Sequence, residues 1–587
     1  MARSVLRFGP YVLNPATGEL RKRDRQLRLA PQAFDVLALL ASRAGETVTR
    51  EEIRREIWGE GTFVDFDLGL YRCLTHIRAV LGDDPRTPRF VETRPRRGYR
   101  FLAPVERAPL AAPSIAVLPF ENVNHDPAFE YFADGVTDAL ITELGGLGGL
   151  RVIARQSVLH LKGSERNIAQ IARELDVDAI VEGTAFRADR CVRVTAQLIG
   201  LEPERHMWAQ SYECEIRDVL GFQSEVASTV ARQVCAAVGR GGSPEPAAVR
   251  TADPEVQDAY LRARHHLSRW TRDGFQHGVE YLQQAIRMNP EFAPAQAALA
   301  DCFSLLGFWG YLPISEAYPK AKTSASTAVR LDPGSSDAHH SLAFILWIHD
   351  WDFQSAEREI ARAIALNPNS ERARLLKACY LAIMTSDRTG AQAEAVQAAR
   401  IDPLGIFTNS CIAWVFFFLR EYEQAIARAS RTLDLYPDSL QAHYVLGLAN
   451  ALQGGSPEAV RMLARAVEIS PDAISIGYLA YANGLAGARE AAQVRLNELL
   501  EKAVHEYVPP KSIICACLGT GDLDGAFAVL ERALAMRDSL AFWIPVVPVF
   551  DGLRADARYG DFLRRLKCEF RRPERKIYRP TTSRGRL

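Results

Sequence analysis

The sequence has 587 residues, 48% hydrophobic and 24% charged, a composition typical of an ordinary globular protein of three or four domains. Ten scattered cysteines without a CxxC pair or a Cys/His zinc spacing argue against a disulfide framework and a zinc site. The longest apolar runs are far below the ~18 residues of a membrane-spanning helix, so we expect a cytoplasmic protein with no membrane anchor.

Charge is unevenly distributed, although 71 basic and 71 acidic residues cancel over the whole chain. Residues 1–105 hold 19 Arg and Lys against 13 Asp and Glu, and residues 571–587 hold seven basic residues against one acidic residue. Basic ends favour a polyanionic partner.

Short strands are expected near the N-terminus, followed by helices. Pro31 suits the first turn of a helix, which Gly45 ends. Thr49 and Glu52 then form the capping box of a second helix that ends near Trp58.

The third predicted helix, residues 68–81, has two distinct faces. Its apolar residues form one narrow stripe: Leu70, Leu74, Ile77 and Leu81. At 100° per residue, Arg72, Thr75, His76 and Ala79 point away from this stripe, and Arg78 lies at its flank. Hydrogen-bond donors among small residues suit the major groove of DNA, where side chains must reach base edges.

The stretch RFVETRPRRGYRF at residues 89–101 predicts a β-hairpin with arginines at its tip. Arg94, Arg96 and Arg97 carry fixed positive charges that fork onto phosphate oxygens. Beside an outward-facing helix, this hairpin predicts a wing that lies along the phosphates or in the minor groove.

This succession, ending in LGDDP and then RFVETRPRRGYRF, resembles the C-terminal winged-helix effector domain of OmpR/PhoB-type regulators over residues 5–105. The resemblance implies that residues 68–81 are the recognition helix and assigns roles to individual side chains. Bases would be read by Arg72, Thr75 and His76, the DNA backbone contacted by Arg78, and the wing contacts made by Arg94, Arg96 and Arg97.

The resemblance has limits. The recognition helix is less basic than in many members of the family, so no target sequence is implied. Many members carry a receiver domain in front, and we expect no aspartyl-phosphate switch here. His76 could instead be a surface histidine without a role, and Arg72 could pair with Asp65 or Asp67.

We expect a winged-helix DNA-binding domain at residues 1–105, a linker at 106–114 and an α/β domain with a mixed sheet at 115–240. The stretches IAVLPFEN, FADGVTDALITEL and VDAIVEGT make the third of these resemble the N-terminal domain of TolB. That likeness implies a fold and is nearly silent on function.

A recurring phrase marks residues 250–540 as a helical array. AIRMNP, AVRLDP, AIALNP, AARIDP, TLDLYP and AVEISP end at Pro290, Pro333, Pro368, Pro403, Pro437 and Pro471. The later spacings of 35, 35, 34 and 34 residues resemble the period of tetratricopeptide (TPR) repeats. We expect six clear units, a degenerate unit near residue 525, and a C-terminal cap with a basic tail at 541–587.

Small residues recur at fixed places in these repeats, where helices must cross closely. Ala356, Ala391, Ala425 and Ala459 lie twelve residues before their prolines, and Ala363, Ala398 and Ala466 lie five before, with Thr432 the exception. Such arrays curve, and their concave face usually binds a protein or peptide. Trp309, Trp347, Trp351 and Trp414 are expected to pack in the array.

The fold class is therefore multidomain, α+β and all-α: a winged helix-turn-helix, a central α/β domain and a TPR α-solenoid. We expect a sequence-specific transcriptional regulator that binds double-stranded DNA and has a protein or peptide on the array. RNA polymerase and a second copy of the chain are further candidate partners. The alternative is a TPR scaffold whose winged helix docks protein. No nucleophile elbow, metal cluster, P-loop or cyclase signature is found, so we expect neither an enzyme nor a cofactor.

Overall fold

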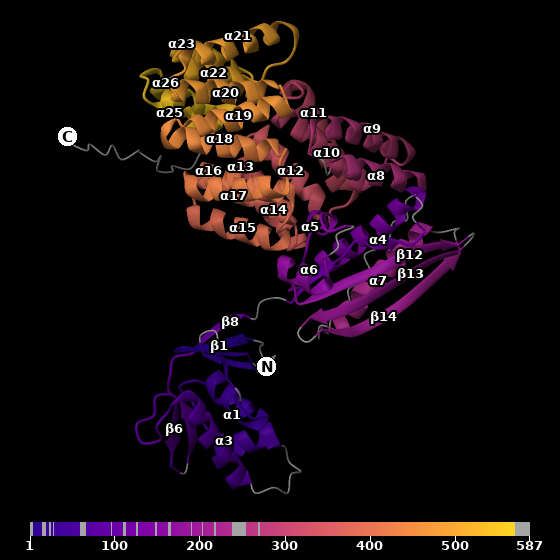
Figure 1. Cartoon of the computed structure of the whole chain (residues 1–587), viewed down its shortest axis with the longest axis vertical. Coiled ribbons are helices and arrows are strands. Elements are labelled where there is room, and N and C mark those ends of the chain that lie inside the picture. The colour runs from indigo at the N-terminus through magenta and orange to yellow at the C-terminus, as the bar shows by residue number, and fades with distance from the viewer. Residues whose placement is uncertain are drawn as a thin grey trace, which may run out of the picture. The chain divides into compact units, whose positions relative to one another are not determined.

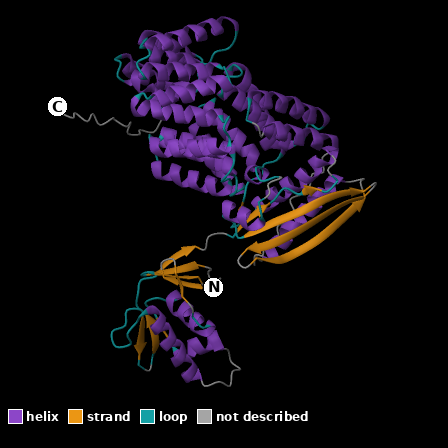
Figure 2. Ribbon diagram, viewed as in Figure 1, coloured by secondary structure: helices purple, strands orange, loops and turns teal. Residues whose placement is uncertain are grey.

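A computed structural model of the chain describes residues 4–14, 19–22, 25–27, 29–58, 66–95, 97–109, 113–124, 127–146, 149–162, 166–188, 191–201, 204–215, 219–237, 254–267 and 270–569. The chain divides into two compact units, residues 1–112 and 113–587, which are described separately (Figure 1). Among the residues that the structure describes, strands are confined to the first 215 positions, and the long C-terminal part is helical (Figure 2).

The first unit joins its helices and two antiparallel sheets in one apolar core; one sheet is ordered β4-β3-β2-β1-β8 and the other β5-β7-β6. Its elements are β1 (Ser4–Phe8), β2 (Tyr11–Asn14), β3 (Glu19–Lys22), β4 (Arg25–Leu27), α1 (Pro31–Ser42), β5 (Thr47–Val48), α2 (Arg50–Ile53) with the π-turn Arg54–Trp58, α3 (Phe66–Leu81), β6 (Val91–Arg94), β7 (Gly98–Phe101) and β8 (Glu106–Pro109).

Local sequence explains the start of two of these helices. Pro31 occupies the first turn of α1, as expected. The predicted capping box is present: the Thr49 side chain accepts from the Glu52 backbone N–H, and the Glu52 carboxylate accepts from that of Thr49 at 2.7 Å. These hydrogen bonds to Thr49 hold the pKa of Glu52 below its usual range.

One expectation for this unit needs correction. Residues 106–109, assigned to the linker 106–114, form strand β8, whose backbone pairs with β1 from Ser4–Pro109 to Arg7–Glu106. An edge strand that ends in proline is compatible with a sheet because its outer side needs no backbone donor.

The middle part, residues 113–237, is a mixed six-stranded sheet covered by helices, as predicted. Strands β11, β9 and β12 run parallel, and β12, β13 and β14 form an antiparallel meander. Its elements are β9 (Ser114–Val117), β10 (Glu121–Asn122), α4 (Pro127–Gly145), β11 (Arg151–Val152), α5 (Arg155–Leu159), α6 (Ile168–Leu175), β12 (Ala179–Ala188), β13 (Cys191–Leu201), β14 (Glu204–Glu215) and α7 (Val219–Ala237).

Both faces of this sheet bury apolar side chains. One core joins Val117, Val181 and Val194 of the strands to Val136 of α4 and Val230 of α7. On the other face, a smaller core holds side chains of α5 and α6. The resemblance to TolB stays a prediction.

The helical array has eight successive helix pairs in the described residues, and each proline of the recurring phrase lies two residues after the second helix of its pair. The pairs are α8 (Pro254–Leu267) and α9 (Arg272–Met288), α10 (Ala293–Phe308) and α11 (Ile314–Leu331), α12 (Ser336–Ile348) and α13 (Phe353–Leu366), α14 (Glu371–Tyr380) with the π-turn Leu381–Thr385 and α15 (Arg388–Ile401), α16 (Ile406–Phe418) and α17 (Tyr422–Leu435), α18 (Leu440–Gly454) and α19 (Pro457–Ile469), α20 (Ala473–Leu485) and α21 (Arg489–His505), and α22 (Pro510–Thr520) and α23 (Leu523–Ala535).

Close helix crossings account for the small residues of the repeat. All seven alanines singled out above are fully buried, and so is Thr432. At Gly447 of α18, an added Cβ would lie 2.5 Å from Cγ of Leu463 in α19. The pair α20–α21 carries no copy of the recurring phrase, which is why the sequence indicated one unit fewer.

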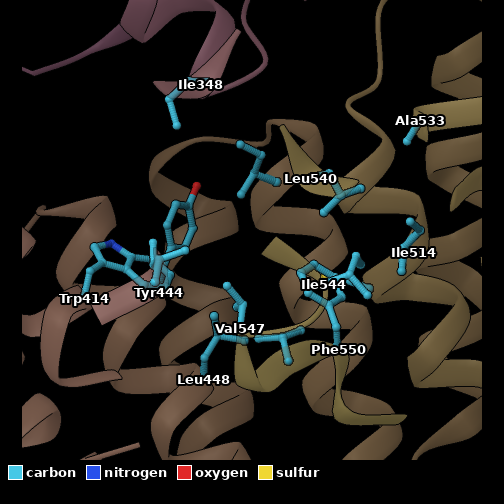
Figure 3. Close-up of a cluster of buried hydrophobic side chains, with 14 of the residues drawn as sticks. Ile348, Trp414, Tyr444, Leu448, Ile514, Ala533, Leu540, Ile544, Val547 and Phe550 are labelled. Atoms are coloured by element: carbon cyan, nitrogen blue, oxygen red, sulfur yellow. The ribbon is translucent and has the colours of Figure 1, made fainter. Parts of the chain in front are cut away.

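The C-terminal segment folds back onto the inner helices of the array. Residues after α23 form α24 (Leu540–Trp543), a 3₁₀ turn (Pro548–Phe550), α25 (Asp551–Arg554) and α26 (Arg558–Glu569). Figure 3 shows Leu540, Ile544, Val547 and Phe550 of this segment in one buried cluster with Trp414 of α16 and side chains of α18. Residues 540–550 are thus part of the core of the array.

The middle part and the array belong to one compact unit. The turns that follow α13 and α15 hold the middle part by hydrogen bonds. Asn369 accepts from the Val152 N–H at 3.1 Å and donates to the carbonyls of Gly145 and Leu150. The Ala154 N–H donates to the Ile401 carbonyl at 2.8 Å.

Candidate nucleic-acid interface

Helix α3 buries the predicted stripe and exposes the opposite face. Leu70, Leu74, Ile77 and Leu81 are at most 3% exposed, and Cys73 joins them in the core. Because this stripe fixes the rotation of the helix, the residues opposite to it face solvent.

The outward face of α3 carries all three predicted base-reading residues. Arg72 and Thr75 are exposed, and His76 is half-buried at the edge of the face. The Thr75 hydroxyl donates to the Tyr71 carbonyl at 2.8 Å, so its own oxygen remains an acceptor. Ala79 adds a small residue on the same face.

Arg78 connects α3 to the hairpin instead of projecting freely. Its Nη2 donates to the Val91 carbonyl at 3.0 Å and to the Thr93 hydroxyl at 2.8 Å, both in β6. The side chain is half-buried. Arg78 therefore helps to fix β6 of the hairpin relative to α3.

The predicted wing is the hairpin of β6 and β7, which pair from Val91–Phe101 to Arg94–Gly98. Gly98 is required at its turn: φ is +129°, and an added Cβ would meet the Val48 carbonyl oxygen at 2.0 Å. Tyr99 and Phe101 are buried in the core, as expected.

The arginines of the wing differ in solvent exposure and in their side-chain partners. Arg97 is exposed, and its backbone N–H donates to the Arg94 carbonyl at 3.0 Å. Arg94 and Arg100 both donate through Nε to Glu92, at 3.0 and 2.9 Å, and these cations hold the pKa of Glu92 low, chiefly through the Arg94 hydrogen bond. Arg96 lies outside the described residues.

The loop between α3 and the wing is organised by one carboxylate. Asp83 is 7% exposed and accepts backbone N–H groups of Arg89, Phe90 and Val91 at 2.6, 3.2 and 2.8 Å. This arrangement gives the LGDDP segment a physical role: it places β6 beside the end of α3.

The acidic partner considered for Arg72 is engaged elsewhere. Asp67 accepts from Arg50 at 3.0 Å, and Asp65 lies outside the described residues. Within the described part of the chain, no ion pair of Arg72 is recorded, which leaves its guanidinium accessible on the outward face.

Two residues of this site were missed in the sequence. Tyr71 is 68% exposed and Leu68 46% exposed, both on the outward side of α3. The rule of 100° per residue places Leu68 about 30° from the centre of that face and Tyr71 about 90° from it, at its flank, so the helical wheel contained the signal for Leu68. Asp83 was missed because its partners become adjacent to it only after the loop folds.

The segment that contains α3 and the wing matches a known protein family. Residues 24–101 match the family described as transcriptional regulatory protein, C terminal, and residues 412–474 match the tetratricopeptide repeat family. The chain carries an OmpR/PhoB-type DNA-binding domain. The OmpR/PhoB-type domain contains α3 and the wing, and TPR repeats follow it in the C-terminal array, as the sequence predicted.

Three curated relatives illustrate the range of similar proteins. "Putative adenylate cyclase 3" of Rhizobium meliloti is 32% identical over 41% of this chain and 42% of its own length. Transcriptional regulator HilA of Salmonella typhimurium is 24% identical over 58% of this chain and 61% of its own. Transcriptional activator CadC of Escherichia coli is 28% identical over 18% and 20%. The chain thus spans less than two thirds of the length of each relative.

The described residues contain neither a membrane-spanning helix nor a metal-binding cluster. No described helix combines the length and apolarity needed to cross a bilayer. Across the same residues, no group of three or more His, Cys, Asp or Glu side chains is arranged to hold a metal ion. The basic tail at 571–587 lies outside the described residues.

Proposed function

We propose that this chain is a sequence-specific DNA-binding transcriptional regulator. Helix α3 enters the major groove, where Arg72, Thr75 and His76 meet base edges. The wing lies on the backbone or in the minor groove, where Arg94, Arg96 and Arg97 meet phosphates, and Arg78 supports the backbone contact. The observation that carries this proposal is the exposed polar face of α3 held beside an arginine-tipped hairpin by Arg78 and Asp83.

The TPR array supplies the regulatory part of this proposal, as a surface for a partner protein or peptide. RNA polymerase and a second copy of the chain are proposed partners of the DNA-bound form, in a cytoplasmic setting. We propose functional domains at residues 1–112, 115–240 and 250–540, with 541–587 as the cap and tail, and no enzymatic activity. A relative named as an adenylate cyclase makes a direct cyclase assay worthwhile.

The first test is the salt dependence of binding to genomic DNA fragments by the full chain. If about five phosphates are neutralised, the logarithm of the binding constant falls against the logarithm of salt concentration with a slope of about −4.5. The double variant Arg96→Ala/Arg97→Ala should weaken binding to all sequences alike and reduce the slope by about 2. Arg362→Ala, an exposed arginine of α13, is the charge-matched control and should change neither quantity.

Unchanged DNA binding by the double variant would remove the wing from the proposal. A full chain that binds no double-stranded DNA at low salt would favour the alternative, a TPR scaffold whose winged helix docks protein. Sequencing of DNA cross-linked to the protein in cells would then show no enriched sites.

A further inference from the structure

We propose that the TPR array contains a binding site for a small aromatic carboxylate, in a cavity of about 520 Å³ between its inner helices and the C-terminal segment. The expected consequence of ligand binding, an effect on transcription, rests on the regulator function proposed above. Ligand binding itself is measured without DNA.

The cavity exists because the array closes on itself. The first helices of successive pairs contact one another and form the inner layer. The beginning of α22 reaches the end of α10, more than two hundred residues earlier in the chain, where Lys511 Nζ donates to the Phe308 carbonyl at 2.8 Å. Residues 540–550 pack against the inner helices (Figure 3). A cavity with room for a small molecule remains beside them, lined in part by Leu540, Val547 and Phe550.

The wall of this cavity is unusually aromatic. Of its 39 lining residues, 13 are Phe, Trp or Tyr, whereas these types make up 9% of the chain. Its volume lies in the range of about 300–1,000 Å³ typical of small-molecule sites, which combine apolar walls with a few polar groups. Planar rings stack well in such surroundings, so an aromatic body fits the wall.

Polar groups without partners lie in the same wall. The hydroxyls of Ser304 and Ser410 and the indole N–H of Trp347 have no hydrogen-bond partner among the described residues, although each side chain is at most 3% exposed. Buried donors of this kind are normally satisfied, and a polar ligand is one way to satisfy them.

Lys511 supplies the charge that selects a carboxylate. Its Nζ lies 5.2 Å from the ring centroids of both Phe308 and Trp309, and burial lowers its pKa to about 8. The Phe308 carbonyl is its one recorded acceptor, and no ion pair of Lys511 is recorded within the described residues. An ammonium group has three donors, so a ligand carboxylate would find both charge and hydrogen bonds here.

The other deeply placed cation of the wall is already neutralised. Arg372 donates to Asp301 at 2.6 Å, so its charge is compensated inside the protein. Arg272 lies over the ring of Tyr311 and is exposed. Asp538 and Asp472 act on Lys511 electrostatically, but neither forms a recorded ion pair with it in the described residues, so a ligand carboxylate would supply that direct partner.

Isothermal titration calorimetry of the full chain with 1-naphthylacetate and its neutral analogue 1-naphthylacetamide tests the site. We expect the carboxylate to bind about ten- to a hundredfold more tightly than the amide, as for a hydrogen bond to a charged group. Five of the eight tryptophans line the cavity, so binding should also change the intrinsic fluorescence.

Lys511→Met keeps the length of the side chain and should remove the preference for the carboxylate while leaving the amide affinity unchanged. Lys320→Met is the matched control, because Lys320 also lies over an aromatic ring, that of Phe303, but outside the cavity wall. Equal affinities of the wild-type chain for acid and amide, or binding of neither, would overturn the proposal even if Lys511→Met failed to fold. DNA binding measured separately keeps this outcome distinct from failure of the regulator function.

Discussion

Arg78 shows how a side chain at a candidate DNA contact can have a structural role first. Its Nη2 joins α3 to both Val91 and Thr93 of the wing. A guanidinium has five N–H donors, so one Nη group can hold β6 while others remain for a phosphate. Arg72, two turns earlier and exposed, has no such engagement recorded within the described residues.

The two arginines should therefore behave differently when replaced by alanine. Arg78→Ala should lower the free energy of unfolding by about 1–2 kcal/mol, because two hydrogen bonds to the wing are lost. It should also weaken binding to all DNA sequences alike, because the wing loses its fixed position. Arg72→Ala should change stability by less than about 0.5 kcal/mol and alter sequence preference.

Urea unfolding and competition binding with randomised DNA measure these outcomes. Wild-type stability in Arg78→Ala would show that the hydrogen bonds to β6 do not position the wing. A uniform loss of affinity in Arg72→Ala would place that side chain on the backbone and not on a base.

At the scale of elements, the position of the wing depends on the Asp83 loop. Three backbone N–H groups converge on one buried carboxylate, and each would lack an acceptor without it. Asp83→Ala should lower the free energy of unfolding of the first unit by about 3 kcal/mol and weaken DNA binding. Asp84→Ala is the control: Asp84 is exposed and its carboxylate accepts only the Arg86 N–H within the described residues, so we expect a much smaller loss.

Thermal unfolding of the two variants, followed by circular dichroism, decides this point. If Asp83→Ala were as stable as Asp84→Ala, the three short contacts would not be what orders the loop.

The elements that could be predicted from sequence are those fixed by neighbours in the chain. The stripe of α3, the Thr49–Glu52 capping box and the repeat of buried alanines each follow from spacings of three to twelve residues. Strand β8 could not be predicted in this way, because its partner β1 lies about one hundred residues earlier. Residues 541–587 were expected to form a cap and a basic tail, but their sequence does not say which surface of the array residues 540–550 contact.

In the candidate site, too, features set by neighbours in the chain were predictable and features set by distant contacts were not. The outward placement of Arg72 and Thr75 agrees with helical periodicity, whereas the engagement of Arg78 with Val91 and of Asp83 with Phe90 depends on how a loop folds. The cavity near Lys511 was beyond prediction, since it needs α10 and α22 to meet.

At the scale of the whole molecule, the middle part and the array share a buried polar link. The Ser157 hydroxyl donates to Asp402 Oδ1 at 2.6 Å and accepts the Leu404 N–H at 2.9 Å. Thr408 donates to the other oxygen of Asp402 at 2.6 Å. Leu404 adds its side chain to the apolar core of the middle part. A displacement of the turn that contains Asp402 and Leu404 would therefore be transmitted to the middle part through these contacts.

Burial raises the pKa of Asp402, and the Ser157 and Thr408 hydrogen bonds limit that rise. Ser157→Ala removes one of these bonds, so the pKa of Asp402 in the folded state should rise further. The variant should lose about 2 kcal/mol of unfolding free energy at pH values where the carboxylate is charged. This loss should shrink as acidification protonates Asp402 in the folded state, because a neutral carboxyl is cheaper to leave unpaired.

Thr408→Val removes the other hydroxyl donor to the Asp402 carboxylate. Thr408 lies in α16 and Asp402 in the turn before it, so this hydrogen bond lies within the array. We expect both variants to lose stability with the same pH trend, because each removes one donor from Asp402. Only Ser157→Ala should speed hydrogen exchange in α5, because only this variant breaks the link to the middle part. If exchange in α5 rose equally in both variants, Asp402 would stabilise the unit as a whole, and the link through Ser157 would have no separate role in joining its two parts.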